Sequence, residues 1–269
     1  MGRTFDRHVT PADVERWADG AVAAARDEVA VEEPLEIRVD GAPVAVTMRT
    51  PGEDEALAVG FLAGEGLIGG PGDVVSAGPS EDLAANVVEV RTRAGLRRDP
   101  AAERSFHLTS SCGVCGKAAL ETVRLEAPEP APHEPLDREL VERAPAEARR
   151  RQRAFERTGG LHATALFEPG GELVALHEDV GRHNAMDKAV GELLLAGRFP
   201  ATGLVGCLSG RASFELVQKA AMARLAGLVA VGAPSSLAVD LARERGMLLC
   251  GFVRDGSFNV YAGRERLRD

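Results

Sequence analysis

The sequence contains no long uncharged hydrophobic run, few aromatic residues and few cysteines. One Trp, one Tyr and four Cys occur in 269 residues, and the segment from Met1 to Val14 is polar and charged. We therefore expect no transmembrane helix, no secretory signal and a cytoplasmic location, where disulfides are rarely structural. The formal net charge is -9, so we expect neither a nucleic-acid nor a membrane partner, because such binding depends on clustered lysine and arginine.

The chain has one C-x-x-C motif, which runs from Cys112 to Cys115 and is followed by Gly116. A structural zinc usually takes four ligands, and the nearest histidine, His107, has an unusual spacing, so we expect no zinc or other metal here. The motif's glycines leave the sulfur atoms uncrowded, and a predicted helix after them would favour reactive thiolates. Two alternatives stay open: a buried turn with two small apolar side chains, and a redox disulfide of the thioredoxin type.

Length and element order predict two domains. We place a smaller N-terminal α+β domain, which includes the C-x-x-C motif, over 1–135 and an α/β domain over 136–269. The predicted elements of the first part are a hairpin over 35–50, a helix starting at 51–54, a strand over 86–90, a proline-rich linker at 127–135 and a charged helical stretch over 137–157.

The second part alternates between strands and helices, the pattern of a parallel sheet covered by helices. Cys207 and Cys250 lie inside apolar runs, so we expect them in the core. The predicted elements are strands over 163–167, 173–176, 204–208, 228–231 and 247–252, and helices over 184–196, 214–226 and 237–245.

Charged and small residues follow the predicted strands. In an open parallel sheet the carboxyl ends of the strands meet at one edge, where ligands bind close to helix N-termini. Arg182, Arg211 and Arg254 fall at this edge, and guanidinium groups pair well with phosphate. The alternatives for single residues are that the nearby serines cap helices, that Arg182 pairs with the carboxylates just before it, and that His183 is structural.

We expect no deaminase activity. Zinc deaminases of nucleosides combine an H-x-E motif with a later P-C-x-x-C motif. Here Thr164 stands where the glutamate should follow His162, and the C-x-x-C motif comes before the histidine. Without that carboxylate the zinc-water mechanism has no general base.

Four segments are distinctive together: Cys112 to Gly116, Gly159 to Ala163, Glu178 to Lys188, and Ser209 to Arg211. They resemble the formate dehydrogenase accessory sulfurtransferases, the FdhD family. The resemblance implies a cytidine-deaminase-like layered α/β domain and a cytoplasmic homodimer. It also implies a sulfurtransferase that accepts persulfide sulfur from a cysteine desulfurase. The sulfur then passes to the molybdenum of the bis(molybdopterin guanine dinucleotide) cofactor, which makes formate dehydrogenase active.

The resemblance also implies residue roles. Cys112 corresponds to the residue that carries the persulfide and Cys115 to a supporting or resolving thiol, although thiol chemistry by itself does not rank the two. Two rival functions stay open: a non-catalytic chaperone that binds the molybdenum cofactor, and a dithiol oxidoreductase. The residues predicted to bind the cofactor, from the strand ends and the resemblance, are Arg182, His183, Ser209, Gly210, Arg211, Phe252, Val253, Arg254, Asp255, Gly256 and Ser257.

Overall fold

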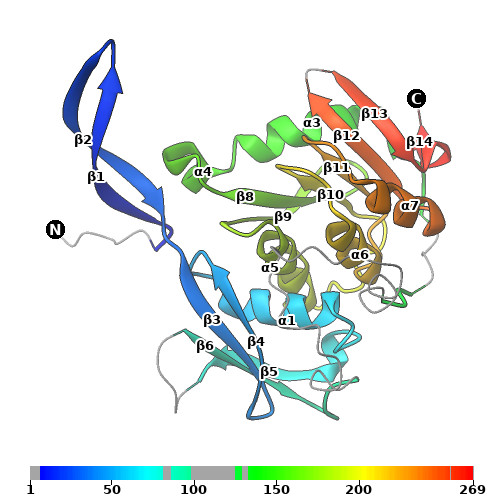
Figure 1. Ribbon diagram of the computed structural model, residues 1–269. Helices are drawn as coiled ribbons and strands as arrows, with labels where there is room; N and C mark the ends of the chain where they lie inside the picture. The colour runs from blue at the N-terminus through cyan, green and yellow to red at the C-terminus, as the bar shows by residue number, and fades with distance from the viewer. Residues whose placement is uncertain (1–6, 81–85, 98–124, 129–132, 255, 269) are drawn as a thin grey trace.

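The structure is a computed structural model that describes residues 7–80, 86–97, 125–128, 133–254 and 256–268. Its strands form a four-stranded sheet, a six-stranded sheet, a two-stranded arm and a short parallel pair of β7 (Leu136–Asp137) with β14 (Leu267–Arg268) (Figure 1). The predicted site residues Cys112, Cys115 and Asp255 lie outside the described residues. None of the described helices is long and apolar enough to span a membrane.

The four-stranded sheet has the order β4 (Ala42–Arg49), β3 (Glu33–Val39), β6 (Val87–Thr92), β5 (Val74–Pro79). β3 and β4 form the predicted hairpin, and Asp40 and Gly41 in its turn both have positive φ. Alternate residues of β3 are buried against the predicted helix α1 (Asp54–Gly64). The sequence did not predict β5, because its residues do not alternate between apolar and polar.

The six-stranded sheet contains the predicted parallel strands. Its order is β13 (Ser257–Ala262), β12 (Leu248–Arg254), β11 (Gly227–Ala230), β10 (Val205–Leu208), β8 (His162–Phe167), β9 (Leu173–Asp179). β10, β11 and β12 are parallel to one another, while β8 is antiparallel to β10 and forms the predicted hairpin with β9. The strand β13 was not predicted. It pairs antiparallel with β12.

Helices cover both faces of this sheet. One core cluster joins the sheet to α5 (Arg182–Leu195), α6 (Phe214–Met222) and α7 (Ser236–Glu244), and a second joins it to α3 (Arg138–Arg149). Cys207 and Cys250 belong to the second cluster, as predicted, and burial raises the pKa of each thiol to about 12. Both thiols therefore stay protonated at neutral pH. The cytidine-deaminase-like assignment and the boundary at 135/136 stay predictions.

The charged stretch over 137–157 is helical, as predicted, and it consists of two helices. α3 ends at Arg149, and α4 (Arg153–Thr158) follows after a short turn. The second helix begins where it does because of Glu178, a residue of β9. Both carboxylate oxygens of Glu178 accept hydrogen bonds from the N–H groups of Ala154 and Phe155, at 3.0 and 2.7 Å. These bonds satisfy the donors at the start of a new helix.

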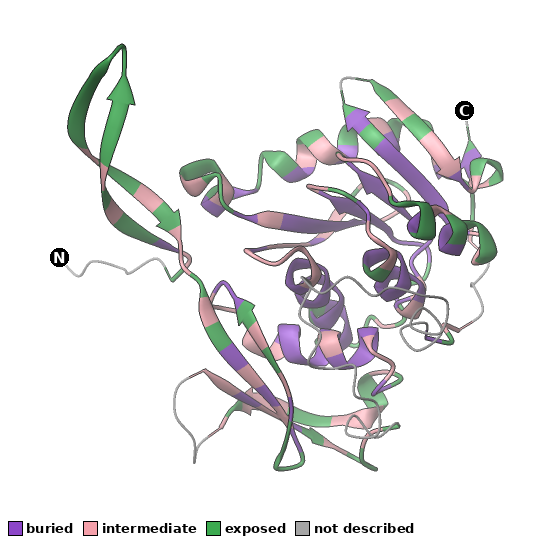
Figure 2. Cartoon of the chain, viewed as in Figure 1, coloured by how far each residue is buried: buried purple, intermediate pink, exposed green. Residues whose placement is uncertain are grey.

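The two sheets are joined by the close packing of α1 against α5 (Figure 1). Gly60 of α1 lies against the backbone of Asp187, and Gly191 of α5 lies against the backbone of Ala56. A Cβ at either glycine would overlap a carbonyl oxygen of the other helix. Figure 2 shows this junction as a buried layer between the two sheets. Glycine is therefore required at both positions by the approach of the backbones.

The arm is a hairpin of β1 (Val9–Ala18) and β2 (Ala21–Ala30) that the sequence did not predict. It projects from the body beside α4 (Figure 1) and is exposed over most of its length (Figure 2). Its base packs in a small cluster that includes Val9, Ala154 and Leu161. Because both faces are open to solvent, the arm lacks the apolar and polar alternation that identifies a half-buried strand.

Candidate functional site

The predicted site residues gather where β10, β11 and β12 end. Backbone hydrogen bonds run across this edge: Ser209 N–H donates to Ala163 O at 3.0 Å, Gly232 N–H to Gly210 O at 3.0 Å, and Phe252 N–H to Gly232 O at 3.2 Å. We call this group the strand-end edge. It comprises His162, Arg182, His183, Ser209, Gly210, Arg211, Gly232 and Phe252.

Two glycines form the middle of the strand-end edge. A Cβ at Gly210 would lie 3.4 Å from Nδ1 of His162, and a Cβ at Gly232 would lie 3.0 Å from Cγ and the backbone nitrogen of Arg211. The backbone at these positions is therefore flanked by the His162 ring on one strand and covered by the stem of Arg211 on the next. Glycine at these two positions therefore leaves room for the His162 ring and the Arg211 stem.

The helix α5 begins at this edge. Its first helical residues are Arg182 and His183, and its N-cap, Gly181, offers no side-chain cap. The first N–H groups of a helix carry partial positive charge and bind anions. Nε2 of His183 lies 2.7 Å from Oε2 of Glu215 on α6, and the pKa of Glu215 is lowered chiefly by this hydrogen bond. His183 is thus held in place by α6, which agrees with its structural alternative.

His162 stands in a positive field. Its pKa is lowered from 6.5, first by burial and then by the charges of Arg182 and His183, while Asp179 acts in the opposite direction. The ring is therefore neutral at pH 7. Its side chain was considered above only for a deaminase mechanism, and sequence reasoning missed its place beside Arg182.

Arg182 and Arg211 lie at the strand-end edge, and Arg254 lies further along at the end of β12. Among the residues that the structure describes, no ion pair or side-chain hydrogen bond is formed by Arg182, Arg211 or Arg254. The alternative that Arg182 pairs with the carboxylates before it was wrong, because Glu178 caps α4 and Asp179 is used elsewhere. Arg211 and Arg254 are exposed, so their charges can reach an anion, whereas Arg182 is half-buried and its charge also helps to lower the pKa of Glu215.

The serines that follow the strands have two different structural roles. Ser213 and Ser235 cap α6 and α7, since their hydroxyl groups accept hydrogen bonds from Leu216 N–H and Ala238 N–H. The cap alternative was therefore correct for both. Ser209 instead accepts a hydrogen bond from the N–H of Ala163 at 2.8 Å, which fixes the end of β10 to the start of β8.

The segment predicted as the end of the third parallel strand has another shape. β12 continues to Arg254 and turns into β13 at Ser257, so Gly256 and Ser257 belong to a hairpin and do not lead into a helix. The pairing shifts between Gly251 and Arg254, where Phe252 has φ of 54° and is 41% exposed. Val253 is buried. This bulge turns the Phe252 ring outward at the edge, and Val253 cannot contact a ligand through its side chain.

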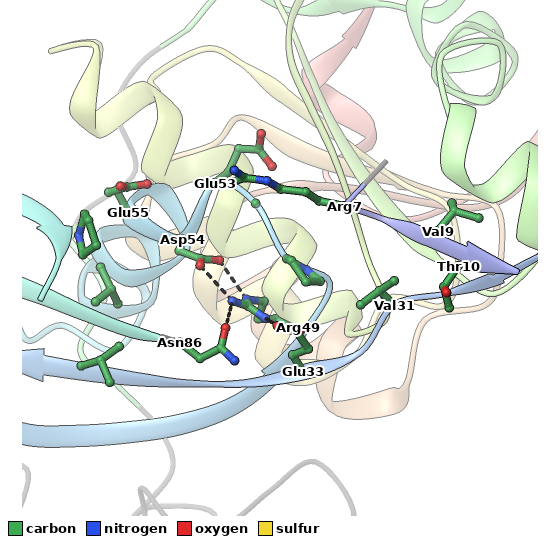
Figure 3. Close-up of a pocket in the computed structure, with 15 residues that line it drawn as sticks. Arg7, Val9, Thr10, Val31, Glu33, Arg49, Glu53, Asp54, Glu55 and Asn86 are labelled. Carbon is green, nitrogen blue, oxygen red and sulfur yellow. Dashed lines mark hydrogen bonds and ion pairs between the residues drawn. The ribbon is translucent and has the colours of Figure 1, made fainter. Parts of the chain in front are cut away.

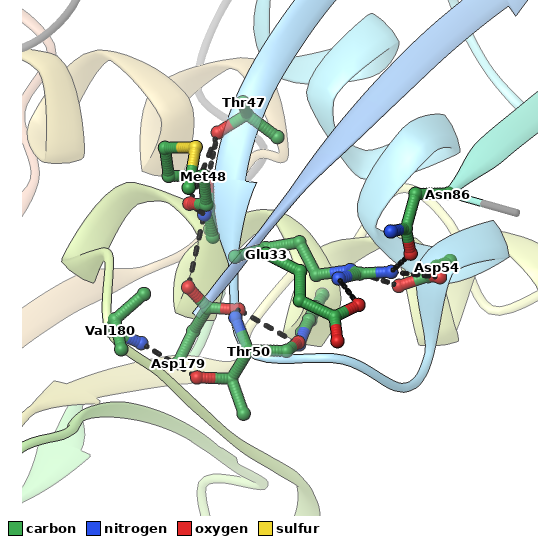
Figure 4. Close-up of polar contacts among 11 residues, drawn as sticks. Glu33, Thr47, Met48, Thr50, Asp54, Asn86, Asp179 and Val180 are labelled. Carbon is green, nitrogen blue, oxygen red and sulfur yellow. Dashed lines mark hydrogen bonds and ion pairs between the residues drawn. The ribbon is translucent and has the colours of Figure 1, made fainter. Parts of the chain in front are cut away.

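Most of the run from Glu178 to Lys188 is structural. Asp179 and Lys188 are fully buried and lie 2.8 Å apart. Asp179 also accepts hydrogen bonds from Thr50 N–H at 3.1 Å, Gly181 N–H at 2.8 Å and the Asn184 amide at 3.0 Å. Figure 4 shows Asp179 beside Thr50 where β4 ends. This network joins α5 to the smaller sheet and positions the first turn of the helix.

A second buried group includes Asp187, the residue just before Lys188 on α5. The Nζ of Lys219 on α6 lies 2.9 Å from Asp187 and 3.0 Å from Glu65, which follows α1. Burial raises the pKa of Asp187 to about 6, against the opposing effect of Lys219, whose own pKa is raised by the two carboxylates in spite of its burial. These contacts tie α1, α5 and α6 together.

A hollow of about 570 Å³ lies at the base of the arm, lined by none of the predicted site residues (Figure 3). Its main buried charge, Arg49, is already bound. The guanidinium donates to Asp54, Glu33 and Asn86, and the pKa of Arg49 is raised because these partners outweigh its burial. The Arg49 guanidinium is therefore not free to bind a ligand in this hollow.

Comparison with known proteins assigns the chain to a family. The model of the FdhD/NarQ family matches residues 30–268. The chain belongs to the FdhD/NarQ family. The resemblance given by the four sequence segments is thereby confirmed.

Full-length relatives agree with the assignment. The sulfur carrier protein FdhD of Streptomyces avermitilis is 51% identical over 277 residues, which cover 99% of this chain and 97% of that protein. The sulfur carrier protein FdhD of Streptomyces coelicolor gives the same values. In structure, the chain is similar to a protein described as a formate dehydrogenase accessory protein from Desulfotalea psychrophila, with a TM-score of 0.77 and 22% identity over 97% of this chain and all of the other. That likeness shows a shared mixed α/β fold.

Proposed function

We propose that this member of the FdhD/NarQ family is a sulfurtransferase that serves formate dehydrogenase, with Cys112 as the sulfur acceptor. Its 51% identity to two sulfur carrier proteins over 99% of the chain supports the sulfur-carrying part of the proposal. The sulfur donor is the persulfide of a cysteine desulfurase. The acceptor is the molybdenum of the bis(molybdopterin guanine dinucleotide) cofactor, which is a substrate here.

The sulfur steps follow from thiol chemistry. The Cys112 thiolate attacks the outer sulfur of the donor's persulfide. The S–S bond to the donor breaks, and the donor cysteine leaves as a thiolate while Cys112 holds the new persulfide. Attack by the Cys115 thiolate on the inner sulfur then releases the outer sulfur as hydrosulfide, which the molybdenum accepts as a ligand. The resulting Cys112–Cys115 disulfide is reopened by a dithiol reductant of the cell.

The strand-end edge is the part of the described structure that fits the nucleotide end of the cofactor. The observation that supports this assignment is that Arg182 in the first turn of α5, Arg211 after β10 and Arg254 at the end of β12 form no ion pair among the described residues. These groups suit the pyrophosphate. The exposed Phe252 ring offers a surface on which a guanine base can stack, since aromatic rings bind bases in this way.

Mass spectrometry after incubation with a cysteine desulfurase and cysteine tests the proposal. We expect the wild-type protein and Cys115→Ala to gain the mass of a sulfur atom on Cys112, and Cys112→Ala to gain none. Formate dehydrogenase from cells with only Cys112→Ala should be inactive. A Cys112→Ala protein that still gains sulfur and still activates the enzyme would refute the role of Cys112.

The same experiment separates the rival functions. A non-catalytic cofactor chaperone predicts that both cysteines can be replaced without loss of formate dehydrogenase activity. A dithiol oxidoreductase predicts a reversible Cys112–Cys115 disulfide and no sulfur gained from the desulfurase.

A further inference from the structure

The turn between α3 and α4 gathers positive charge on the surface. Four of the five residues from Arg149 to Arg153 are arginines, and all four are exposed, while Gln152 between them is buried. We call these four arginines the arginine elbow. The chain as a whole has a net charge of -9, so this concentration of one sign is a local feature. Local clusters of one sign attract partners of the opposite sign.

The arginine elbow has little negative charge of its own to pair with. Glu147 accepts a hydrogen bond from Nε of Arg151 at 3.1 Å, and its other carboxylate oxygen accepts one from Arg150. These two hydrogen bonds, that from Arg150 first, lower the pKa of Glu147. Arg149 and Arg153 form no ion pair with any described residue. Four guanidinium groups therefore share one bound carboxylate.

Arg149 is held in place although it has no carboxylate. Its guanidinium lies over the ring of Phe155, with its central carbon 4.6 Å from the ring centroid. Phe155 in turn packs against the small cluster of Val9, Ala154 and Leu161 at the base of the arm. A guanidinium that is already oriented loses less side-chain entropy when it binds a carboxylate through its planar donor fork.

The arginine elbow lies next to the strand-end edge. Arg153 is the first residue of α4, and the N–H of the following residue, Ala154, donates to Glu178 near the end of β9. Glu178 lies opposite Ala163 of β8, the neighbour of His162 in the strand-end edge. Figure 1 shows α4 beside β8 and the base of the arm. A protein bound at the elbow would therefore also face the strand-end edge.

The surroundings of the arginine elbow favour a short acidic patch over a long polyanion. Exposed Glu156 follows on α4, and exposed Asp27 lies on the neighbouring strand β2. A nucleic acid that extended beyond the elbow would meet these carboxylates and a chain of net negative charge. A protein surface with a few clustered carboxylates can match the elbow without covering the acidic groups around it.

We propose that the arginine elbow docks an acidic patch of formate dehydrogenase and thereby holds this client beside the strand-end edge. The inference rests on the proposed function, which supplies the identity of the client. It commits to formate dehydrogenase and not to the cysteine desulfurase, because the strand-end edge is proposed for the acceptor cofactor, and that cofactor ends in formate dehydrogenase.

Two double variants test this surface. Arg149→Gln with Arg153→Gln, the elbow variant, removes the two charges without a carboxylate partner and leaves the hydrogen bonds of Glu147 and Glu178 intact. Arg91→Gln with Arg243→Gln is the matched control, because both arginines are exposed, lie on β6 and α7, and form no ion pair with any described residue. The two variants have the same net charge, and both should unfold at the wild-type temperature.

Biolayer interferometry with cofactor-free formate dehydrogenase of the same organism measures the binding. We expect wild type and control to bind equally, and the elbow variant to bind at least about tenfold more weakly, chiefly through slower association. Wild-type affinity should fall between about 0.1 M and about 1 M salt, since the Debye length shrinks from about 10 Å to about 3 Å. The elbow variant should lose less affinity over this range, because two of the screened charges are gone.

Two further ligands separate the elbow from the other binding sites. All three proteins should bind guanosine diphosphate, a probe for the nucleotide end of the cofactor, with equal affinity, and they should bind the cysteine desulfurase equally. If the elbow variant loses affinity for guanosine diphosphate, the elbow belongs to the nucleotide site. If it loses affinity for the desulfurase and not for formate dehydrogenase, the elbow serves the sulfur donor. Either result would overturn the proposal.

The docking proposal and the proposed function fail in different ways. An elbow variant that binds formate dehydrogenase as tightly as the control does, or a wild type that does not bind it, refutes the docking surface. In both cases the gain of sulfur on Cys112 in mass spectrometry would leave the sulfurtransferase function standing. A wild-type chain that gains no sulfur on Cys112 would instead refute the proposed function itself.

Discussion

The buried pair of Lys188 and Asp179 gives the sharpest prediction about the fold. Both side chains are fully buried, and the Nζ of Lys188 lies 2.8 Å from Asp179 and 2.8 Å from the carbonyl oxygen of Thr50. Lys188→Met keeps most of the volume but leaves the Asp179 carboxylate buried without its cation. Removing one partner of a buried ion pair costs roughly 3–5 kcal/mol of unfolding free energy.

Urea unfolding measures this loss, and the melting temperature should fall on the order of 10 °C for a chain of this size. The double variant Asp179→Asn with Lys188→Met removes both charges, and we expect it to lose less than the sum of the single variants, with a coupling of about 1–3 kcal/mol. Arg198→Met is the control, because Arg198 and its partner Glu168 are 51% and 37% exposed, and such pairs contribute about 1 kcal/mol or less. If Lys188→Met costs no more than Arg198→Met, the network between α5 and the smaller sheet does not hold the two parts together.

Two further predictions concern the helix junction and the site. Gly60→Ala should lower the free energy of unfolding by several kcal/mol, because its Cβ would overlap the carbonyl oxygen of Asp187. Gly170→Ala, with open space around it, should lower it by less than about 1 kcal/mol. Equal losses for the two variants in urea unfolding would rule out the close packing of α1 against α5. In an NMR titration His162 should have a pKa below 6.5, and Arg182→Gln should raise it while Arg211→Gln should not. Since the folded chain binds this proton less readily than the unfolded chain, the stability that His162 contributes is present above pH 6.5 and is lost as the pH falls below it. A pKa above 6.5 in the wild type would contradict the positive field at the edge.

The sequence predicted the elements whose pattern is local. The parallel strands, the helices between them and the β3–β4 hairpin each carry their own periodicity and turn residues, and buried Cys207 and Cys250 follow from the apolar runs. The arm and β5 were missed because exposed strands have no alternation. The bulge at Phe252 was missed because a positive φ outside glycine is set by the neighbouring strands.

The sequence predicted where the site residues lie better than it predicted what each residue does. The strand ends do bring Arg182, Arg211 and Ser209 to one edge. However, Asp179 and Lys188 serve the packing of α5 against β4, and their partners lie about 130 residues away in the chain, in contacts that a single sequence does not contain. Glu178 also has a structural role, because its carboxylate accepts hydrogen bonds from the first N–H groups of α4.

The most direct test of the account follows labelled sulfur from a desulfurase to the cofactor of formate dehydrogenase. We predict that Cys112→Ala carries no label and passes none. The double variant Arg182→Gln with Arg211→Gln should accept label at the wild-type rate and pass it more slowly, because the edge holds the acceptor and not the donor. Label that reaches the cofactor through Cys112→Ala, or at the wild-type rate through the arginine variant, would contradict the account.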